Sequence, residues 1–206
     1  MRVLVLAKEP VAGQSKTRLQ QRWSPAQAAA LAQASLADTL EAVASVDAHH
    51  ELVLQGAPGD WLPPGFDVRR QVNGTHDERI AAALAAHEEP CLLIGMDTPQ
   101  VTTELLEIAL AALLRKDASF GPAEDGGWWC LGLRTPARHS SLVLGIPTST
   151  TTTGAAQHAA LRSARLSVEL MPMLRDVDLP DDALNVAALA PDGRFAQLLR
   201  LFEHAA

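Results

Sequence analysis

The stretch Val3-Leu4-Val5-Leu6-Ala7 is followed directly by Lys8-Glu9-Pro10-Val11-Ala12-Gly13-Gln14-Ser15-Lys16-Thr17-Arg18. The first five residues are apolar without alternation, which is typical of a strand covered on both faces of a parallel sheet. The polar residues after them form a loop that contains one glycine and several cations. In sheets of this kind, ligands bind beyond the carboxyl ends of the strands. We therefore expect an α/β fold with a ligand-binding loop directly after its first strand.

The rest of the chain alternates strand-like and helix-like segments. Ser24-Pro25-Ala26-Gln27 supplies an N-cap, a proline at the first helical position and a capping-box glutamine. Further strands are expected at Glu51–Gln55, Phe66–Gln71, Cys91–Gly95, Ala118–Gly121, Trp128–Leu133 and Ser167–Met171. Further helices are expected at His76–His87, Thr102–Arg115, Gly154–Arg165, Pro180–Ala190 and Gly193–His204. The alternation predicts one three-layer α/β domain over residues 1–206, with a largely parallel sheet.

Composition narrows the class of protein. The 206 residues carry a net charge of −7, which argues against nucleic acid as a partner. The apolar start of the chain is too short for a secretory signal or a membrane span, so a cytoplasmic protein is expected. Cys91 and Cys130 each lie in an apolar strand-like run without a nearby cysteine or histidine, which predicts buried, reduced thiols.

The first loop concentrates positive charge in an acidic chain. Lysine occurs only at positions 8, 16 and 116, and Lys8 and Lys16 lie in this loop together with Arg18. Gly13 permits a tight turn with exposed N–H groups, so the segment is suited to a pyrophosphate. It is not a P-loop, because two residues separate Gly13 from Lys16. A solvated basic loop without a ligand is the alternative.

Two aspartates stand in similar settings. Asp97 follows the strand Cys91–Gly95 and precedes Pro99, and Asp178 precedes Pro180. Carboxylates at such positions suit Mg²⁺ or Mn²⁺, which take oxygen ligands and keep phosphate and water in their shell. We expect Asp97 and Asp178 to face each other across the cleft and hold the metal. The alternative is that both only favour the helices that follow them.

The segment Gly121–Trp129 joins two expected strands through Glu124, Asp125, Gly126 and Gly127. Glycines let a ligand approach the backbone, and either carboxylate can orient a hydroxyl or act as a base. A hairpin turn without a ligand explains the same residues. The two tryptophans that follow should point to opposite faces of their strand. In the segment Gly74–Arg79, Glu78 and Arg79 can contact a base or ribose, or simply begin a helix.

Four motifs in this order resemble a bacterial family of GT-A-fold, glycosyltransferase-like proteins, the radical-SAM/selenodomain-associated transferases. They are Lys8-x-Pro10-x-x-Gly13-x-x-Lys16-Thr17-Arg18-Leu19, Gly95-x-Asp97-x-Pro99, Gly121-Pro-x-Glu124-Asp125-Gly126-Gly127 and Asp176-Val177-Asp178-x-Pro180. The resemblance covers nearly the whole chain. It implies a Rossmann-like, mixed but mostly parallel sheet of the nucleotide-diphospho-sugar transferase type. Trp128 and Trp129 stand where the family usually has tyrosines.

The resemblance also implies roles for these residues. Phosphate binding falls on the first loop, at Lys16 and Arg18 within a motif that includes Lys8, Pro10, Gly13 and Thr17. The metal falls on Asp97 and Asp178. The acceptor or sugar pocket falls on Asp125, Gly126 and Gly127, with Glu124 and Trp128 beside them.

The leading hypothesis is glycosyl transfer from a nucleotide-sugar to a small-molecule acceptor that the sequence does not name. Mg²⁺ or Mn²⁺ at Asp97 and the Lys16 ammonium would stabilise the leaving nucleoside diphosphate, with Asp125 as base or sugar-orienting carboxylate. One alternative is nucleotidyl transfer from an NTP to a phosphorylated small molecule. Another is a non-catalytic nucleotide-binding protein. The sequence indicates no oligomeric state.

Overall fold

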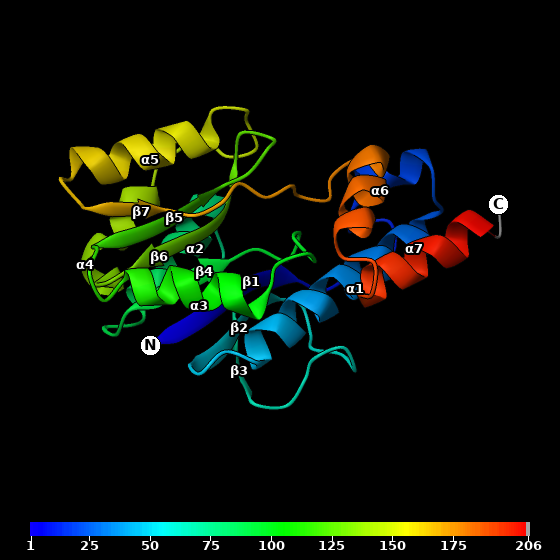
Figure 1. Cartoon of the computed structure of the whole chain (residues 1–206), viewed down its shortest axis with the longest axis horizontal. Coiled ribbons are helices and arrows are strands. Elements are labelled where there is room, and N and C mark those ends of the chain that lie inside the picture. The colour runs from blue at the N-terminus through cyan, green and yellow to red at the C-terminus, as the bar shows by residue number, and fades with distance from the viewer. Residues whose placement is uncertain (205–206) are drawn as a thin grey trace.

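The computed structural model describes residues 1–204 of the chain and shows one sheet between two layers of helices (Figure 1). The strands are β1 (Arg2–Lys8), β2 (His49–Gln55), β3 (Phe66–Arg70), β4 (Cys91–Ile94), β5 (Ala118–Pro122), β6 (Trp128–Leu133) and β7 (Val168–Leu170). Their order across the sheet is β3-β2-β1-β4-β6-β5-β7. β6 runs antiparallel to both of its neighbours, and the other strand pairs are parallel. The predicted α/β fold with a mixed, mostly parallel sheet is confirmed.

The long helices follow the pattern expected from the sequence. They are α1 (Pro25–Ala44), α2 (His76–Ala85), α3 (Thr103–Ala112), α5 (Thr153–Ser163), α6 (Pro180–Leu189) and α7 (Arg194–His204). Three short elements were not expected, namely α4 (Pro136–His139) and the 3₁₀ helices η1 (Thr17–Gln21) and η2 (Ser140–Val143). Each is only about one turn long, too short for an apolar residue to recur at helical spacing.

Burial on both faces explains the continuous apolar run of β1. Val3, Val5 and Ala7 pack in the core that α1 and α3 cover, whereas Leu4 and Leu6 pack in the core that α2 and α5 cover. Residues alternate between the two faces of a strand, so both sets must be apolar. The same two cores contain Cys91 and Cys130, which are buried free thiols as predicted.

A third core lies beyond the sheet. The helix α1 has 20 residues and is about 30 Å long, whereas the seven-residue β1 spans about 23 Å. The first turns of α1 pack with η1, α6 and α7 in a separate apolar cluster. This cluster includes Leu19, Trp23, Leu31, Val186 and Phe195. Figure 1 shows this helical unit to one side of the sheet. It joins the segment after the first loop to the last helices of the described chain.

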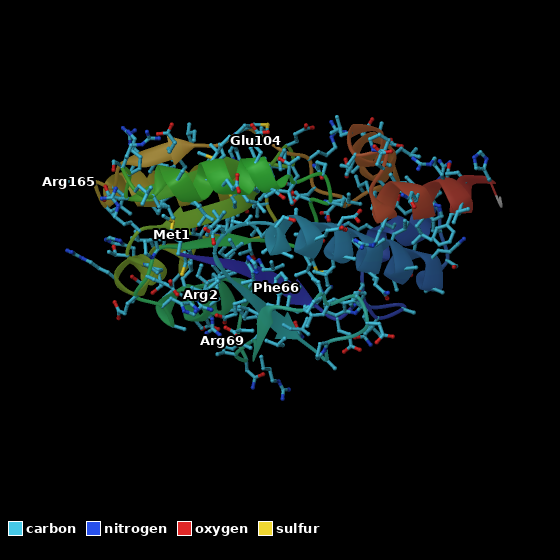
Figure 2. All side chains as sticks on the ribbon, turned by 60° about the horizontal axis from the view of Figure 1, so that its bottom comes forward. Met1, Arg2, Phe66, Arg69, Glu104 and Arg165 are labelled. Atoms are coloured by element: carbon cyan, nitrogen blue, oxygen red, sulfur yellow. The ribbon has the colours of Figure 1, made fainter. Side chains whose placement is uncertain are left out.

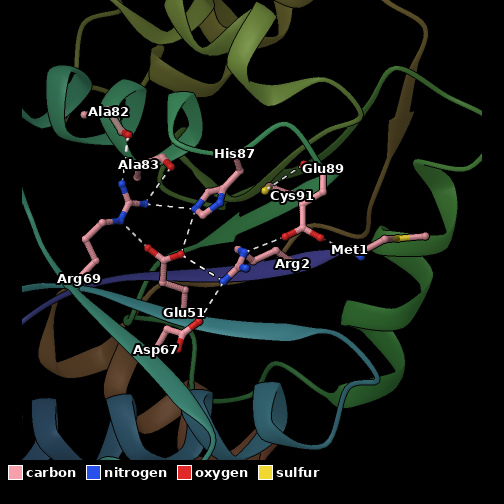
Figure 3. A network of polar contacts seen from close by, with 10 residues as sticks. All are labelled: Met1, Arg2, Glu51, Asp67, Arg69, Ala82, Ala83, His87, Glu89 and Cys91. Carbon is pink, nitrogen blue, oxygen red and sulfur yellow. Dashed lines mark hydrogen bonds and ion pairs between the residues drawn. The ribbon is translucent and has the colours of Figure 1, made fainter.

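A charged network marks the opposite end of the sheet. Glu51 on β2 is only 4% exposed and contacts Arg2, Arg69 and His87 (Figure 3). Figure 2 shows Arg2 and Arg69 on the side of the sheet away from α6 and α7. Three basic groups around one carboxylate satisfy a charge that would otherwise be costly to bury. The network closes the amino ends of β1 and β2 and leaves the carboxyl ends for the site.

None of the helices within residues 1–204 has both the length and the apolar character that a membrane span requires.

Candidate active site

A cleft of about 780 Å³ opens at the carboxyl ends of the central strands. From β1 the chain adds β2 and then β3 on one side of the sheet. It then returns to the other side of β1, where β4 pairs with it. Such a reversal of strand order is a topological switch point, where α/β sheets bind their ligands. Lys8 ends β1 and Asp97 follows β4, and both line the cleft. The first loop and the Asp97 segment are therefore brought together as predicted.

The first loop is shaped by a tight turn. The N–H groups of Gln14 and Ser15 donate to the Val11 carbonyl, and the buried Ser15 hydroxyl donates to the Glu9 carbonyl. Lys16 then takes a left-handed conformation with φ 47° and ψ 45°, immediately before η1. Leu19 of η1 is fully buried in the third core and anchors the loop.

This turn decides which loop residues face the cleft. Lys8, Lys16, Thr17 and Arg18 belong to its lining, as predicted for phosphate-binding residues. Pro10 and Gly13 lie in the turn behind them, outside the lining that residues 1–204 form. The phosphate roles of these six residues remain predictions.

Lys16 makes the densest polar contacts in the cleft. Its ammonium lies 2.8 Å from Asp97 Oδ1 and 3.3 Å from Asp178 Oδ1, and it donates to the Val177 carbonyl. Its side chain is only 8% exposed. Burial opposes the charged form, but Asp97 and Asp178 outweigh it and hold the pKa of Lys16 above its ordinary value. The lysine is thus a cation held between the two expected metal ligands.

The segment Asp176-Val177-Asp178 reaches the cleft from the far side. The Val177 N–H donates to the Asp97 carbonyl and joins the two segments, and the Asp97 and Asp178 carboxylates both contact the Lys16 ammonium. Asp178 also accepts from Arg18 at 2.8 Å. Asp176 was not predicted as a site residue, although its motif was noted. Burial, together with the charges of Asp97 and Asp125, raises the pKa of Asp176 to about 8.

The residues fit a divalent cation of the hard, oxygen-binding kind. Asp97 and Asp178 supply carboxylate oxygens, and Asp176 adds a third carboxyl group to the same lining. Thr98 also lines the cleft, and its buried hydroxyl has no hydrogen-bond partner among the described residues. Within residues 1–204 no group of three or more His, Cys, Asp or Glu is arranged as a complete metal site. That is compatible with Mg²⁺, which is often held by one or two carboxylates and completed by substrate phosphate.

The Asp-Gly-Gly turn joins β5 to β6 and is a hairpin. Asp125 Oδ1 accepts from the Gly127 N–H at 2.7 Å, and Gly126 has φ +89°. Asp125, Gly127 and Trp128 line the cleft. Glu124 instead pairs with Arg175 and, like Gly126, lies outside the lining formed by the described residues. Of the two carboxylates, Asp125 is therefore the one placed to meet a ligand.

The tryptophans divide between the two faces of β6 as predicted. Trp129 is buried in the core under α1 and α3 and donates to the Pro172 carbonyl, whereas the partly buried Trp128 packs with the core under α2 and α5.

A threonine-rich segment forms a wall of the cleft that sequence reasoning missed. Thr148, Ser149, Thr150, Thr151 and Thr153 all line it. The carbonyl of Thr151 lies so close to Gly126 that a Cβ there would be 2.0 Å away. The run Thr150–Thr153 is unusual in composition, but it carries no pattern that indicates a particular chemistry.

The far end of the cleft lies beside β2, β3 and α2. Arg79 lines it and donates to the Gln55 side chain at 2.7 Å, while Gln71 donates to the carbonyls of Ala7 and Val53. The predicted partner Glu78 instead accepts from the Thr75 N–H and caps α2, which is the alternative stated for it. Sequence reasoning missed Gln55 and Gln71 because nothing in a glutamine at a strand end distinguishes it from a surface residue.

Comparison with protein families gives one match over most of the chain. The model of a family described as uncharacterised proteins conserved in bacteria, DUF2064, matches residues 13–150. The matched region includes the end of the first loop, Asp97 and the Asp-Gly-Gly turn.

Similar proteins include one curated relative and many solved structures. A 2-phospho-L-lactate guanylyltransferase of Natrialba magadii is 29% identical over 193 residues, covering 83% of this chain and 78% of that protein. A Desulfovibrio desulfuricans protein, provisionally assigned as a nucleotide-diphospho-sugar transferase, has a TM-score of 0.88 and 27% identity, covering 98% of this chain and 95% of that one. The 2-C-methyl-D-erythritol 4-phosphate cytidylyltransferase of Thermus thermophilus has a TM-score of 0.58 and 19% identity, covering 93% and 100%. These likenesses show that this chain has the same fold as the Desulfovibrio protein, that of a nucleotide-diphospho-sugar transferase.

Proposed function

We propose that this chain, which belongs to the DUF2064 family of bacterial proteins, is a metal-dependent nucleotidyltransferase. The reaction is transfer of a nucleoside monophosphate from an NTP to a phosphorylated small molecule. One observation carries the proposal: Lys16 and Arg18 of the first loop meet Asp97 and Asp178, from two distant segments, in a single cleft at the switch point of the sheet.

The chemistry follows from the charges in this cleft. A phosphate oxygen of the acceptor attacks the α-phosphorus, a new P–O bond forms, and the bond to the bridging β-oxygen breaks. Pyrophosphate leaves with the electron pair. Lys16 and Arg18 can stabilise the charge that develops on the leaving group. A divalent cation held by Asp97 and Asp178 would supply further charge neutralisation on the phosphates.

The cleft has distinct regions on either side of this centre. Gln55, Gln71 and Arg79 lie on the β2–β3 side, and Asp125, Trp128 and the threonine segment lie on the β6 side. We assign the nucleotide to the first and the acceptor to the second, because the cations of the first loop adjoin β1 and β2. Hydroxyl groups and Asp125 then surround the acceptor.

From the sequence alone, glycosyl transfer is the leading hypothesis and nucleotidyl transfer is an alternative. The order is reversed here because the curated relative is a guanylyltransferase and a structure of similar fold is a cytidylyltransferase. Both names describe transfer of a nucleotide to a small phosphorylated molecule. Glycosyl transfer from a nucleotide-sugar stays a second candidate, because the Desulfovibrio protein with a TM-score of 0.88 carries that provisional assignment.

The products separate the two reactions. The protein is incubated with Mg²⁺, each of the four NTPs and a panel of phosphorylated three- and four-carbon acids, and pyrophosphate is measured. A parallel series offers nucleotide-sugars, and nucleoside diphosphate is measured. Acceptor-dependent pyrophosphate release supports the proposal. Nucleoside diphosphate from a sugar donor, with no pyrophosphate from any NTP, would replace it with glycosyl transfer.

A further inference from the structure

Lys16 occupies the space between the two carboxylates that are expected to bind the metal. Its ammonium contacts Asp97 at 2.8 Å and Asp178 at 3.3 Å, and it also donates to the Val177 carbonyl. An ammonium group has three donors, so these three contacts use its full capacity. In this arrangement Lys16 has no donor left for a phosphate.

The backbone of Lys16 is itself in an unusual conformation. Lys16 is a non-glycine residue with φ 47°, a left-handed conformation that L-residues adopt only at a cost in free energy. The contacts with Asp97, Asp178 and Val177 offset this cost. Lys8, in the same loop, bonds to the Gln14 carbonyl and makes no ion pair with either carboxylate among the described residues.

We propose that Lys16 is an internal counter-ion that competes with the divalent cation for Asp97 and Asp178, so that the metal and the phosphate of the substrate bind cooperatively. With neither ligand bound, the ammonium pairs with both carboxylates, and Arg18 pairs with Asp178 as well. A phosphate attracts the ammonium and frees the carboxylates, and a metal displaces the ammonium and frees it for phosphate. Each ligand therefore strengthens the binding of the other, as reciprocal linkage requires.

This inference rests on the proposed use of Asp97 and Asp178 as metal ligands. It concerns how the binding of metal and of phosphate are coupled, and not which reaction follows. Metal alone should bind weakly, since it must first displace a buried and well-paired cation. Coupling free energies of this kind typically change affinity by about 5- to 150-fold. An effect of that size is measurable without any turnover.

The test is Mn²⁺ binding, measured by the loss of the free-ion signal in electron paramagnetic resonance, with no nucleotide present. Lys16→Met should bind Mn²⁺ about tenfold more tightly than the wild type or better. Lys116→Met is the matched control, because it removes the same charge from a lysine outside the cleft lining of the described residues, and it should bind Mn²⁺ as the wild type does. Adding Asp97→Asn to Lys16→Met should abolish the gain.

The second arm uses inorganic pyrophosphate as a phosphate probe, with correction for the complex it forms with Mn²⁺ in solution. Pyrophosphate should tighten Mn²⁺ binding in the wild type and have a much smaller effect in Lys16→Met. Circular dichroism checks that the variants fold. If Lys16→Met does not fold, Lys16→Gln replaces it as a neutral variant. Unchanged or weaker Mn²⁺ binding in the neutral Lys16 variant would overturn the inference.

The two proposals fail separately. If Lys16→Met gains Mn²⁺ affinity but the wild type turns over no NTP with any acceptor, the counter-ion role stands and the proposed reaction falls. If the wild type releases pyrophosphate with an acceptor and Lys16→Met shows no gain, the reaction stands and the counter-ion role falls.

Discussion

Asp97 is the residue at which the loop, the sheet and the late aspartate segment meet. Its carboxylate contacts Lys16, and its carbonyl accepts from Val177. Asp97→Asn keeps the shape but removes the charge, so metal-dependent turnover should fall about 100-fold or more. The measurement is pyrophosphate release at saturating NTP across a Mg²⁺ titration. Asp47→Asn, at an exposed position just after α1, should retain activity, and a fully active Asp97→Asn would exclude Asp97 from the metal site.

Gly126 holds the Asp-Gly-Gly turn against the threonine segment. Gly126→Ala should lower the free energy of unfolding by more than about 1 kcal/mol, because φ is +89° and the new Cβ would lie 2.0 Å from the Thr151 carbonyl. Urea denaturation measures this. Gly65→Ala is matched, since Gly65 has φ +90° and its Cβ would meet nothing within 4 Å. Equal losses in the two variants would show that backbone strain alone, and not contact with Thr151, fixes this turn.

Single residues were predictable where their chemistry is unusual for their position. A lysine pair in an acidic chain and an aspartate directly after a buried strand both marked the cleft. Asp176 was harder to assign, because its character comes from burial beside other carboxylates, which only the folded chain creates. Glu78 and Glu124 show that a carboxylate in a motif need not face the ligand. Glu78 caps α2, and Glu124 pairs with Arg175.

Among the elements, the segment between β7 and α6 links stability to the site. Val177 is fully buried in the third core, and the aspartates on either side of it line the cleft. Val177→Ala should cost about 2 kcal/mol of stability, from lost apolar burial and a small cavity. It should also raise KM for the NTP, because Asp178 loses its anchor.

Val186→Ala is the control for this prediction. Val186 is equally buried in the same core but lies on α6, and the residue does not line the cleft formed by the described chain. The two variants should lose similar stability, measured by thermal unfolding, and only Val177→Ala should change KM. A matching change of KM in both would mean that the helical unit, rather than this segment, controls the site.

Elements with a repeated pattern were predictable, and their pairing was not. The strands and long helices follow from apolar runs, the Ser24 cap and helical spacing. The antiparallel pairing of β6 with β5 agrees with the hairpin turn that the Asp-Gly pair allowed, whereas the pairing of β6 with β4 depends on contacts between distant segments, which no local pattern reports. The helical unit was also unforeseen, because packing of η1 against α6 and α7 joins residues more than 150 positions apart.

At the scale of the whole molecule, the Glu51 network predicts a response to pH at the end of the sheet away from the cleft. His87 lies 2.9 Å from Glu51. Burial, and then Arg2 and Arg69, lower the pKa of His87 below 6.5 in spite of Glu51. Below about pH 6.5, His87 is therefore protonated in the unfolded chain but stays neutral in the folded chain. The free energy of unfolding then falls as the pH falls toward the pKa of His87 in the folded chain.

Urea denaturation between pH 5 and pH 8 tests this with His87→Gln, which keeps a polar group and removes the titration. The variant should lose less stability on acidification than the wild type. His76 has a pKa lowered by burial and contributes in the same direction, so only the difference between the two proteins reports His87. His49→Gln, at an exposed position, should follow the wild type. Identical pH dependence in wild type and His87→Gln would show that the network does not resist protonation.

The third core has a consequence for the order in which the protein is made. Synthesis proceeds from the amino terminus, and early segments can fold before later ones exist. A nascent chain that has reached β7 contains every strand of the sheet, yet Asp176, Asp178, α6 and α7 are still missing. Lys16 then has only one of its two carboxylates, and η1 has no helices to pack against. The sheet can thus form early, whereas the cleft is completed only after Asp178 and the helices that follow it have been translated.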